Sequence, residues 1–302
     1  MRRPGWNLAV LDKPPSSPVP SAVSVSPDRP LPEEWFPDHQ NGSITPHAQA
    51  LLYPYPAPDG DFWMRDGLPW PVPQGIAGEA LVGRVPVLSV GSNRAPLQLR
   101  RKFGTDATIP VTAAMLHDCD IVFAASIAPY GAIPATAHPH QGVRVRLNIA
   151  WLAAAQLQHM HATEALGIAY DFIRYDASAV SHVAVPASRD HDVFCQPVFG
   201  YQARNGALAL DGVLTAQAGI ATCGRKLATA DQKTMLDRLR RHFRGLGDAA
   251  ERLPLNNWLS RIVTDRAARL ALQAELAEYA IQPVKPPWQK EQVVSADAAD
   301  FL

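Results

Sequence analysis

Two short segments of the chain carry residue types that could together form a small active site. Residues 90–93 read Val-Gly-Ser-Asn and lie between an apolar run and a helix-permissive stretch at 97–103. A Gly-Ser-Asn turn before a helix presents free backbone N–H groups, and such a cradle binds a carboxylate or phosphate. The second segment contains Glu164, a lone carboxylate between a helix-like run and a strand-like run. An anion cradle and one carboxylate would suffice for proton transfer on a small acid.

These segments, together with two others in the same order, resemble the γ-glutamylcyclotransferase-like family. That family usually has Tyr-Gly-Ser-Asn where this chain has Val90-Gly91-Ser92-Asn93. Residues 129–136 (PYGAIPAT) are similar to the family's glycine-containing block, and residues 141–164 are similar to the strand and helix that carry its catalytic glutamate. The resemblance covers roughly residues 86–205. It departs from the family pattern at Val90, which lacks the tyrosine hydroxyl, and at His161, where the family often has Asp.

The resemblance implies a reaction without a metal or cofactor. The α-amine of a γ-glutamyl amide attacks the γ-carbonyl of the same molecule and releases 5-oxoproline and an amine. Glu164 is the implied general acid/base, and partial burial beside Leu157, Ile168 and Tyr170 would favour its protonated form. The expected partner is a small molecule with a free α-amino acid end, such as glutathione or another γ-glutamyl amide. The expected substrate contacts are Val90, Gly91, Ser92, Asn93, Tyr130, Gly131, Tyr170 and Tyr201.

Two alternatives to this enzyme stay open. The same fold could be a non-catalytic or altered-substrate binding module whose extensions serve a partner. A His-ligated, metal-dependent hydrolase is the other alternative, because residues 138–140 and 159–161 are His-x-His pairs and imidazole is a common zinc ligand. Two histidines at this spacing point the same way on a strand but diverge on a helix, and no carboxylate has the spacing of a His-Glu-x-x-His motif.

Composition excludes several classes of protein. Lys+Arg and Asp+Glu both total 28 and the pI is near 7.2, so nothing indicates nucleic acid or an anionic membrane surface as a partner. Cys119, Cys195 and Cys223 match no metal or disulfide framework, which is typical of a reducing cytoplasm. His191 with Cys195 or Cys223 could form a nucleophilic pair by residue type alone. No signal peptide and no run as long as a membrane span is recognisable, so we expect a cytoplasmic protein.

The elements that position these residues are expected to form an α+β domain, a small mixed β-barrel of the γ-glutamylcyclotransferase type at residues 86–222. Apolar runs and alternation predict strands at 119–127, 142–151 and 168–175 and a helix at 153–163. Further strands are expected within 182–186 and 194–203, followed by a hairpin turn at Asn205-Gly206.

Two extensions are expected around this domain. Seventeen of the 28 prolines lie at or before Pro86, so residues 1–85 are predicted to be an irregular extension. Its aromatic residues favour a wrap packed on another surface over a docking surface for a partner, and a cover over the site is a further hypothesis. Residues 223–302 are predicted to be a helical extension. One helix there would begin with a Thr229–Gln232 capping box, and a second would run over about 256–280.

Overall fold

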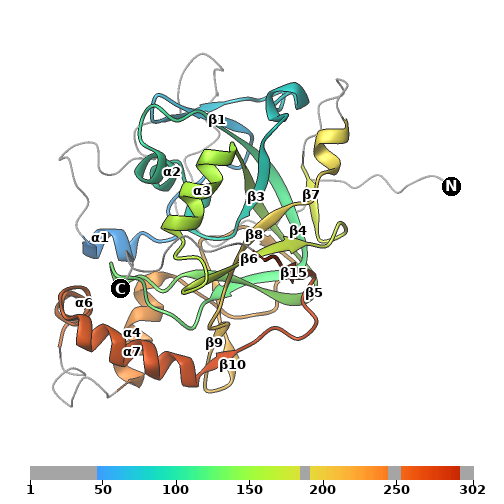
Figure 1. Cartoon of the computed structure of the whole chain (residues 1–302). Coiled ribbons are helices and arrows are strands. Elements are labelled where there is room, and N and C mark those ends of the chain that lie inside the picture. Colours follow the sequence, from blue (N-terminus) through green and yellow to red (C-terminus); the bar gives the residue numbers. More distant parts are fainter. Residues whose placement is uncertain (1–45, 184–190, 244–252, 293–302) are drawn as a thin grey trace.

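The computed structural model describes residues 46–183, 191–243 and 253–292 (Figure 1). The fold is built on a mixed sheet of twelve strands, in which β4 (Ile109–Phe123) and β5 (Ala135–Leu152) form one long antiparallel hairpin. Val143, Val145 and Leu147 of β5 are buried, as their alternation with polar residues predicts. Helices pack around this sheet, and the expected α+β class is confirmed.

Eight strands cross the large sheet in the order β13, β11, β4, β5, β3, β8, β6 and β15. Four others join at the sides: β1 and β7 pair with β4, β2 pairs with β1, and β12 pairs with β5. The other strands of this sheet have the bounds β1 (Phe62–Arg65), β2 (Leu68–Pro71), β3 (Val85–Ser89), β6 (Tyr170–Tyr175), β7 (Val180–His182), β8 (Phe199–Ala203), β11 (Ala216–Gln217), β12 (Thr222–Cys223), β13 (Thr229–Ala230) and β15 (Trp288–Lys290). A separate sheet of three strands contains β10 (Val213–Leu214), β9 (Ala207–Leu210) and β14 (Ala280–Ile281).

The barrel expected at residues 86–222 is not confirmed, because in the described part of the chain this sheet is not closed. The ends of the sheet are occupied by short strands from beyond residue 222. At one end β15 pairs with the outer edge of β6, and at the other β13 pairs in parallel with β11. The C-terminal segment therefore contributes strands to the sheet as well as helices.

The N-terminal segment also contributes to the sheet. Residues 46–85, expected to be irregular, contain α1 (Pro46–Leu51), β1 (Phe62–Arg65), β2 (Leu68–Pro71) and a 3-10 helix, η2 (Gly78–Leu81). The β1–β2 hairpin turns at Asp66 and Gly67, which have the positive φ angles (54° and 68°) that a two-residue turn requires. The sheet tolerates the prolines of β2 because β2 pairs only with β1. The extension up to residue 45 lies outside the described residues.

Three helices of the C-terminal segment lie together at one end of the molecule (Figure 1): α4 (Gln232–His242), α6 (Leu255–Thr264) and α7 (Arg266–Glu278). The single helix expected at 256–280 is thus two helices, because Asp265 leaves the helical conformation and its side chain accepts a hydrogen bond from the Ala268 N–H. The capping box expected at Thr229 is also wrong. Asp231 caps α4 by accepting from the Thr234 N–H at 2.7 Å.

Two other helices position the candidate site. The chain leaves β3, forms the one-turn helix η3 (Ser92–Arg94) and continues into α2 (Pro96–Phe103). After β5 it forms α3 (Ala154–Thr163), which packs beside α2 (Figure 1). A search of the described helices for one with the length and apolar character needed to cross a membrane finds none.

Candidate functional site

A pocket lies where β3 ends, and several separate segments of the chain line it. It holds about 340 Å³ of atom-free space, including the part that is open to solvent. The lining residues are Tyr53, Leu88, Ser89, Val90, Gly91, Ser92, Asn93, Ala135, Glu164, Tyr170 and Tyr201. Residues 90–93, Glu164, Tyr170 and Tyr201 were all expected from the sequence, and the structure brings them together.

Two of the expected contacts, Tyr130 and Gly131, do not line this pocket. Gly131 has a φ of +89°, and a Cβ there would collide with Leu259 of α6. This glycine therefore permits the close approach of the C-terminal helices. Tyr130 interacts with the hydroxyl of Tyr55, and burial raises its pKa well above the ordinary value.

Backbone hydrogen bonds close the turn at residues 91–93, which the sequence predicts to be an anion cradle. The N–H of Arg94 donates to the carbonyl of Gly91 at 3.2 Å, and the N–H of Ala95 donates to the carbonyl of Ser92 at 2.9 Å. The N–H groups of Arg94 and Ala95 are therefore used to close the turn. Residues 91–93 line the pocket at the start of a helical segment, where an anion is favoured.

Glu164 follows the last residue of α3, where its N–H donates to the carbonyl of Met160 at 3.0 Å. Its Oε1 accepts a hydrogen bond from Asn93 Nδ2 at 2.8 Å, which joins the two chemical motifs across 71 positions of sequence. The side-chain oxygen Oδ1 of Asn93 is buried and has no hydrogen-bond partner within the described residues. This oxygen and the carboxylate are two acceptors that a ligand's amine or ammonium could use.

Glu164 is not the isolated carboxylate that its sequence context indicates. Lys102 Nζ, from the last turn of α2, forms an ion pair with Glu164 Oε1. The two side chains are only 6% and 12% exposed, and Lys102 also contacts Met160 Sδ at 3.4 Å. The expectation that burial favours a protonated Glu164 considered only apolar neighbours. The buried environment also contains this ammonium, which compensates the negative charge within the protein.

The tyrosines of the pocket are hydrogen-bond donors near neutral pH. Burial raises the pKa of Tyr170 well above 10, and it also raises that of Tyr201. The negative charge of Glu164 acts in the same direction on both hydroxyls. The Tyr201 hydroxyl is 2.7 Å from His161 Nδ1, and burial lowers the pKa of this histidine. His161, which stands where the resembled family often has Asp, therefore contacts a tyrosine of the pocket.

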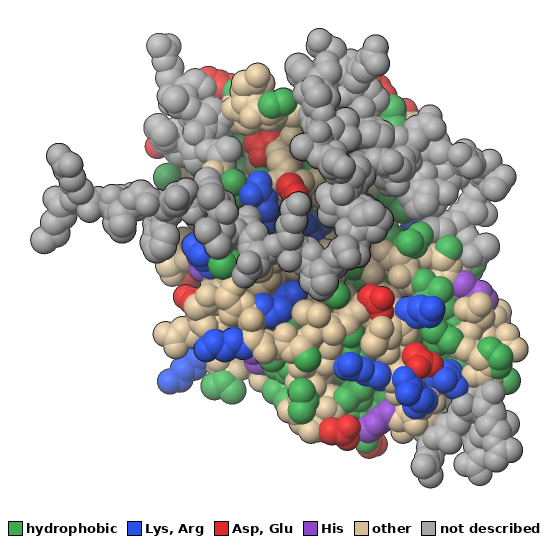
Figure 2. Space-filling view, turned by 180° about the vertical axis from the view of Figure 1, so that it is seen from behind, with side chains coloured by type: hydrophobic (Ala, Val, Ile, Leu, Met, Phe, Trp, Pro, Cys, Tyr) green, Lys and Arg blue, Asp and Glu red, His purple; other side chains and the backbone are tan. Residues whose placement is uncertain are grey.

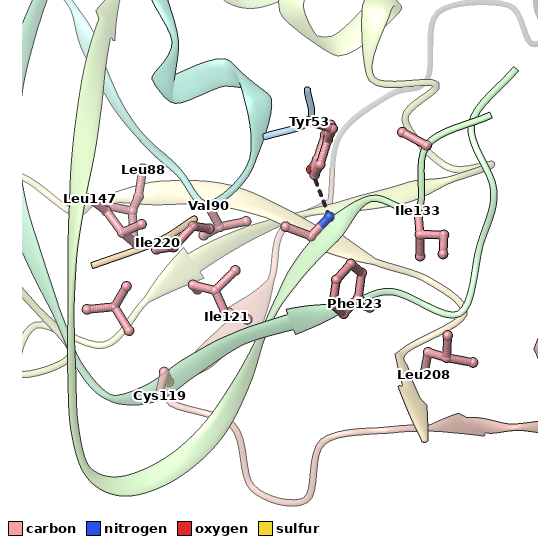
Figure 3. Close-up of a cluster of buried hydrophobic side chains, with 14 of the residues drawn as sticks. Tyr53, Leu88, Val90, Cys119, Ile121, Phe123, Ile133, Leu147, Leu208 and Ile220 are labelled. Carbon is pink, nitrogen blue, oxygen red and sulfur yellow. Dashed lines mark hydrogen bonds between the residues drawn. The ribbon is translucent and has the colours of Figure 1, made fainter. Parts of the chain in front are cut away.

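Tyr53 and Lys102 are among the residues of the site that sequence reasoning missed. The Tyr53 hydroxyl accepts a hydrogen bond from the Ala135 N–H at 2.7 Å (Figure 3). Gly91 lies directly beside this hydroxyl, since a Cβ at Gly91 would collide with it. The aromatic content of the N-terminal segment did predict packing on another surface, but nothing in the sequence singles out Tyr53.

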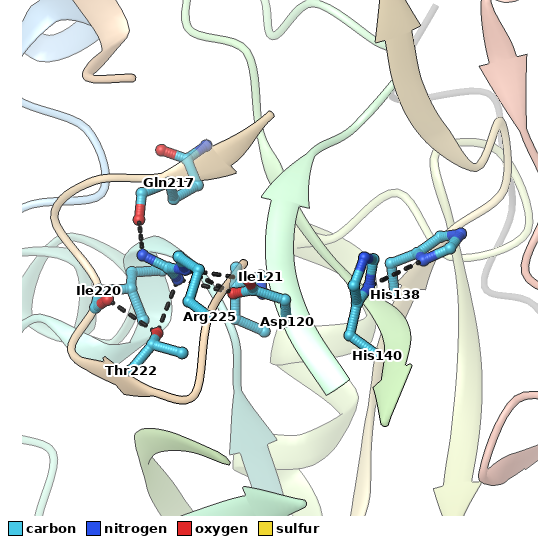
Figure 4. Close-up of polar contacts among 8 residues, drawn as sticks. All are labelled: Asp120, Ile121, His138, His140, Gln217, Ile220, Thr222 and Arg225. Atoms are coloured by element: carbon cyan, nitrogen blue, oxygen red, sulfur yellow. Dashed lines mark hydrogen bonds and ion pairs between the residues drawn. The ribbon is translucent and has the colours of Figure 1, made fainter. Parts of the chain in front are cut away.

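The histidine pairs form no comparable site. His138 and His140 are adjacent on β5, with 3.5 Å between their Nδ1 atoms (Figure 4). On α3 the two histidines diverge: His159 Nε2 is 2.6 Å from the carbonyl of Lys102, and His161 contacts Tyr201. Among the described residues, no three His, Cys, Asp or Glu side chains are placed to hold a metal ion.

The cysteines form no disulfide with one another. Cys119 is buried, and burial raises the pKa of its thiol to about 12, so it is protonated at neutral pH. Cys195 is exposed at the end of η4 (His191–Cys195), and Cys223 accepts a contact from Arg144 Nη2 at 3.5 Å. The side chain of His191 lies outside the described residues, so the proposed Cys–His pair stays a prediction.

Charges of both signs are mixed on the face in Figure 2, where basic and acidic side chains alternate among the parts not covered by grey atoms. This distribution agrees with the balanced composition of 28 basic and 28 acidic residues. The chain matches no protein-family model, no curated protein and no solved structure.

Proposed function

We propose that this protein is a γ-glutamylcyclotransferase-like enzyme of the cytoplasm that converts a γ-glutamyl amide into 5-oxoproline and an amine. The observation that carries the proposal is the meeting of Glu164 with the 91–93 turn in one pocket, through the 2.8 Å hydrogen bond from Asn93 Nδ2. The resemblance of the sequence to that family names these same residues.

The pocket offers complementary groups to both ends of an α-amino acid. Backbone N–H groups of the 91–93 turn would hold the α-carboxylate of the substrate. Its α-amine would lie against the Glu164 carboxylate and the unpaired Oδ1 of Asn93. Lys102 and Asn93 both hold Oε1 of Glu164, which leaves Oε2 for the substrate.

The reaction then needs one carboxylate and no nucleophile from the protein. The amine nitrogen attacks the γ-carbonyl carbon and forms the C–N bond of the five-membered ring, while the C–N bond of the original amide breaks. Glu164 takes a proton from the attacking nitrogen and returns a proton to the leaving nitrogen. Tyr170 remains protonated in the pocket, so its hydroxyl is a donor available to the γ-carbonyl oxygen as negative charge develops on it.

A second candidate function, a binding module on the same fold, is favoured by the ion pair. Because Glu164 already carries a counter-ion in Lys102, the pocket can bind an amino acid end without any transfer of a proton. The two functions differ in what Glu164→Gln does. This variant should abolish turnover by an enzyme, whereas a module would bind its ligand without turnover already in the wild type.

The test is a screen of glutathione, γ-glutamyl peptides and γ-glutamyl amines for release of 5-oxoproline. Glu164→Gln is the test variant. Glu278→Gln, on the exposed side of α7, is the matched control because it makes the same change of charge away from the pocket. We expect activity in the wild type and the control, with or without a chelator, and none in Glu164→Gln. No release from any substrate by the folded wild type would contradict the proposed reaction.

A further inference from the structure

Tyr53 comes from a part of the chain that the family resemblance does not cover, yet it lines the candidate site. It follows α1 and is 82 positions before Ala135, whose N–H donates to it at 2.7 Å. Tyr53 lines the pocket and is 6% exposed.

The contacts of this hydroxyl determine the direction of its own proton. The Ala135 N–H donates to the phenol oxygen at 2.7 Å, so this oxygen acts as an acceptor. Among the described residues no acceptor for the Tyr53 proton is found, so the O–H group is available to a ligand in the pocket. Donation of N–H bonds to a hydroxyl also polarises its O–H and strengthens the bond that it can donate. Burial raises the pKa of Tyr53 well above 10, so the proton is present at neutral pH.

The segment that carries Tyr53 is attached to the body of the protein on both sides. Before it, His47 Nε2 of α1 is 2.8 Å from Ser260 Oγ of α6. After it, the carbonyl of Pro58 accepts from Asn148 Nδ2 at 3.2 Å, and the carbonyl of Asp59 accepts from Arg146 at 2.7 Å and 2.9 Å. These contacts hold the tyrosine in place before a ligand binds, so its side chain is preorganised in the pocket.

We infer that Tyr53 is a substrate-binding residue whose O–H donates a hydrogen bond to a carboxylate oxygen of the ligand held by the 91–93 turn. Figure 3 shows its side chain directed at the strand that borders this turn. The hydroxyl lies beside Gly91 of this turn, because a Cβ at Gly91 would collide with it. The inference rests on the proposed function for the identity of the ligand, but it requires only a bound carboxylate.

The experiment compares Tyr53→Phe with the wild type in turnover of γ-glutamyl substrates and in calorimetric binding of 5-oxoproline and L-glutamate. The variant keeps the aromatic ring and loses only the hydroxyl. Because this hydroxyl would donate to a charged group, we expect kcat/KM and affinity to fall about 10- to 100-fold. Tyr55→Phe is the matched control, since the Tyr55 hydroxyl donates to the Gln49 carbonyl at 3.1 Å outside the pocket, and it should behave like the wild type.

The outcomes separate this inference from the proposed function. Turnover by the wild type with an unchanged kcat/KM in Tyr53→Phe would overturn the role of Tyr53 and leave the reaction intact. Binding by the wild type without turnover would overturn the reaction, and the loss of affinity in Tyr53→Phe would still support the inference. Tighter binding by Tyr53→Phe would show that the hydroxyl blocks the cradle, and a wild type that neither binds nor reacts would contradict both. Unfolding of each variant in urea ensures that folded proteins are compared.

Discussion

Replacement of Lys102 by Met tests whether Glu164 is a buried charge that depends on its partner. The pair is 6% and 12% exposed at its two side chains, so it is largely removed from water. Removing one partner of a buried ion pair costs about 3–5 kcal/mol, because the remaining charge is left uncompensated. The hydrogen bond from Asn93 at 2.8 Å persists in this variant, so we expect the lower end, about 3 kcal/mol.

The assay is urea unfolding at pH 7, analysed by linear extrapolation with the slopes compared among variants. The double variant Lys102→Met/Glu164→Gln removes the orphaned charge as well, and it should regain most of the lost stability. Lys290→Met is the matched control, because Lys290 pairs with Asp171 at 2.7 Å but is 59% exposed. An exposed pair contributes at most about 1 kcal/mol. A loss in Lys102→Met no larger than in the control, or no recovery in the double variant, would refute the reasoning.

Three further changes have expected outcomes in the same urea assay. Arg225→Ala should cost about 3–5 kcal/mol, because it leaves the carboxylate of Asp120, which is 0% exposed, without its ion pair at 2.7 Å (Figure 4). Gly91→Ala should cost about 1–3 kcal/mol, because the new Cβ collides with the Tyr53 hydroxyl, and Tyr53→Phe should relieve part of this cost. Burial lowers the pKa of His182 from 6.5 to about 4, so the unfolded chain binds the proton more readily. Stability should therefore fall as the pH falls from about 6.5 to about 4, by about 2 kcal/mol between pH 7 and pH 5 for this residue.

Each of these expectations has a control and a contradicting result. Arg241→Ala, at a pair whose arginine is 65% exposed, should cost less than Arg225→Ala, and equal losses would contradict the burial argument. An additive loss in the double variant of Gly91 and Tyr53 would argue against a steric clash. His182→Phe removes the titrating group, so its stability should depend less on pH over this range. The same slope in the variant and the wild type would exclude His182 as a cause.

The sequence predicted those helices and strands in which apolar residues recur with a clear period. The alternation of Val143, Val145 and Leu147 with polar residues indicated a strand with one buried face, and β5 has that face. The break between α6 and α7 was missed although Asp265 is a typical N-cap residue, because apolar residues continue at helical spacing on both sides. The three-residue strand β15 is too short to have a period, so its pairing with β6 could not be predicted.

The candidate site was predictable only where its residues belong to ordered motifs. Residues 90–93 and Glu164 were identified, and they line one pocket. Lys102 was not identified because it ends a run of three basic residues in the last turn of α2. Cations are common at that position because they interact favourably with the helix dipole. Nothing in that run shows which side chain packs beneath α3. Tyr53 was missed because its contact with Ala135 spans 82 positions and depends on how the N-terminal segment crosses the sheet.

The most direct test of the central claim is the product formed from a γ-glutamyl peptide in water enriched in ¹⁸O. Intramolecular attack by the α-amine takes no oxygen from water. We therefore expect 5-oxoproline without ¹⁸O, formed in equal amount to the released amine by the wild type and absent with Glu164→Gln. Release of glutamate that carries one ¹⁸O atom would show hydrolysis by a water molecule instead. That result would contradict the assignment of Glu164 as the acid/base of a cyclisation.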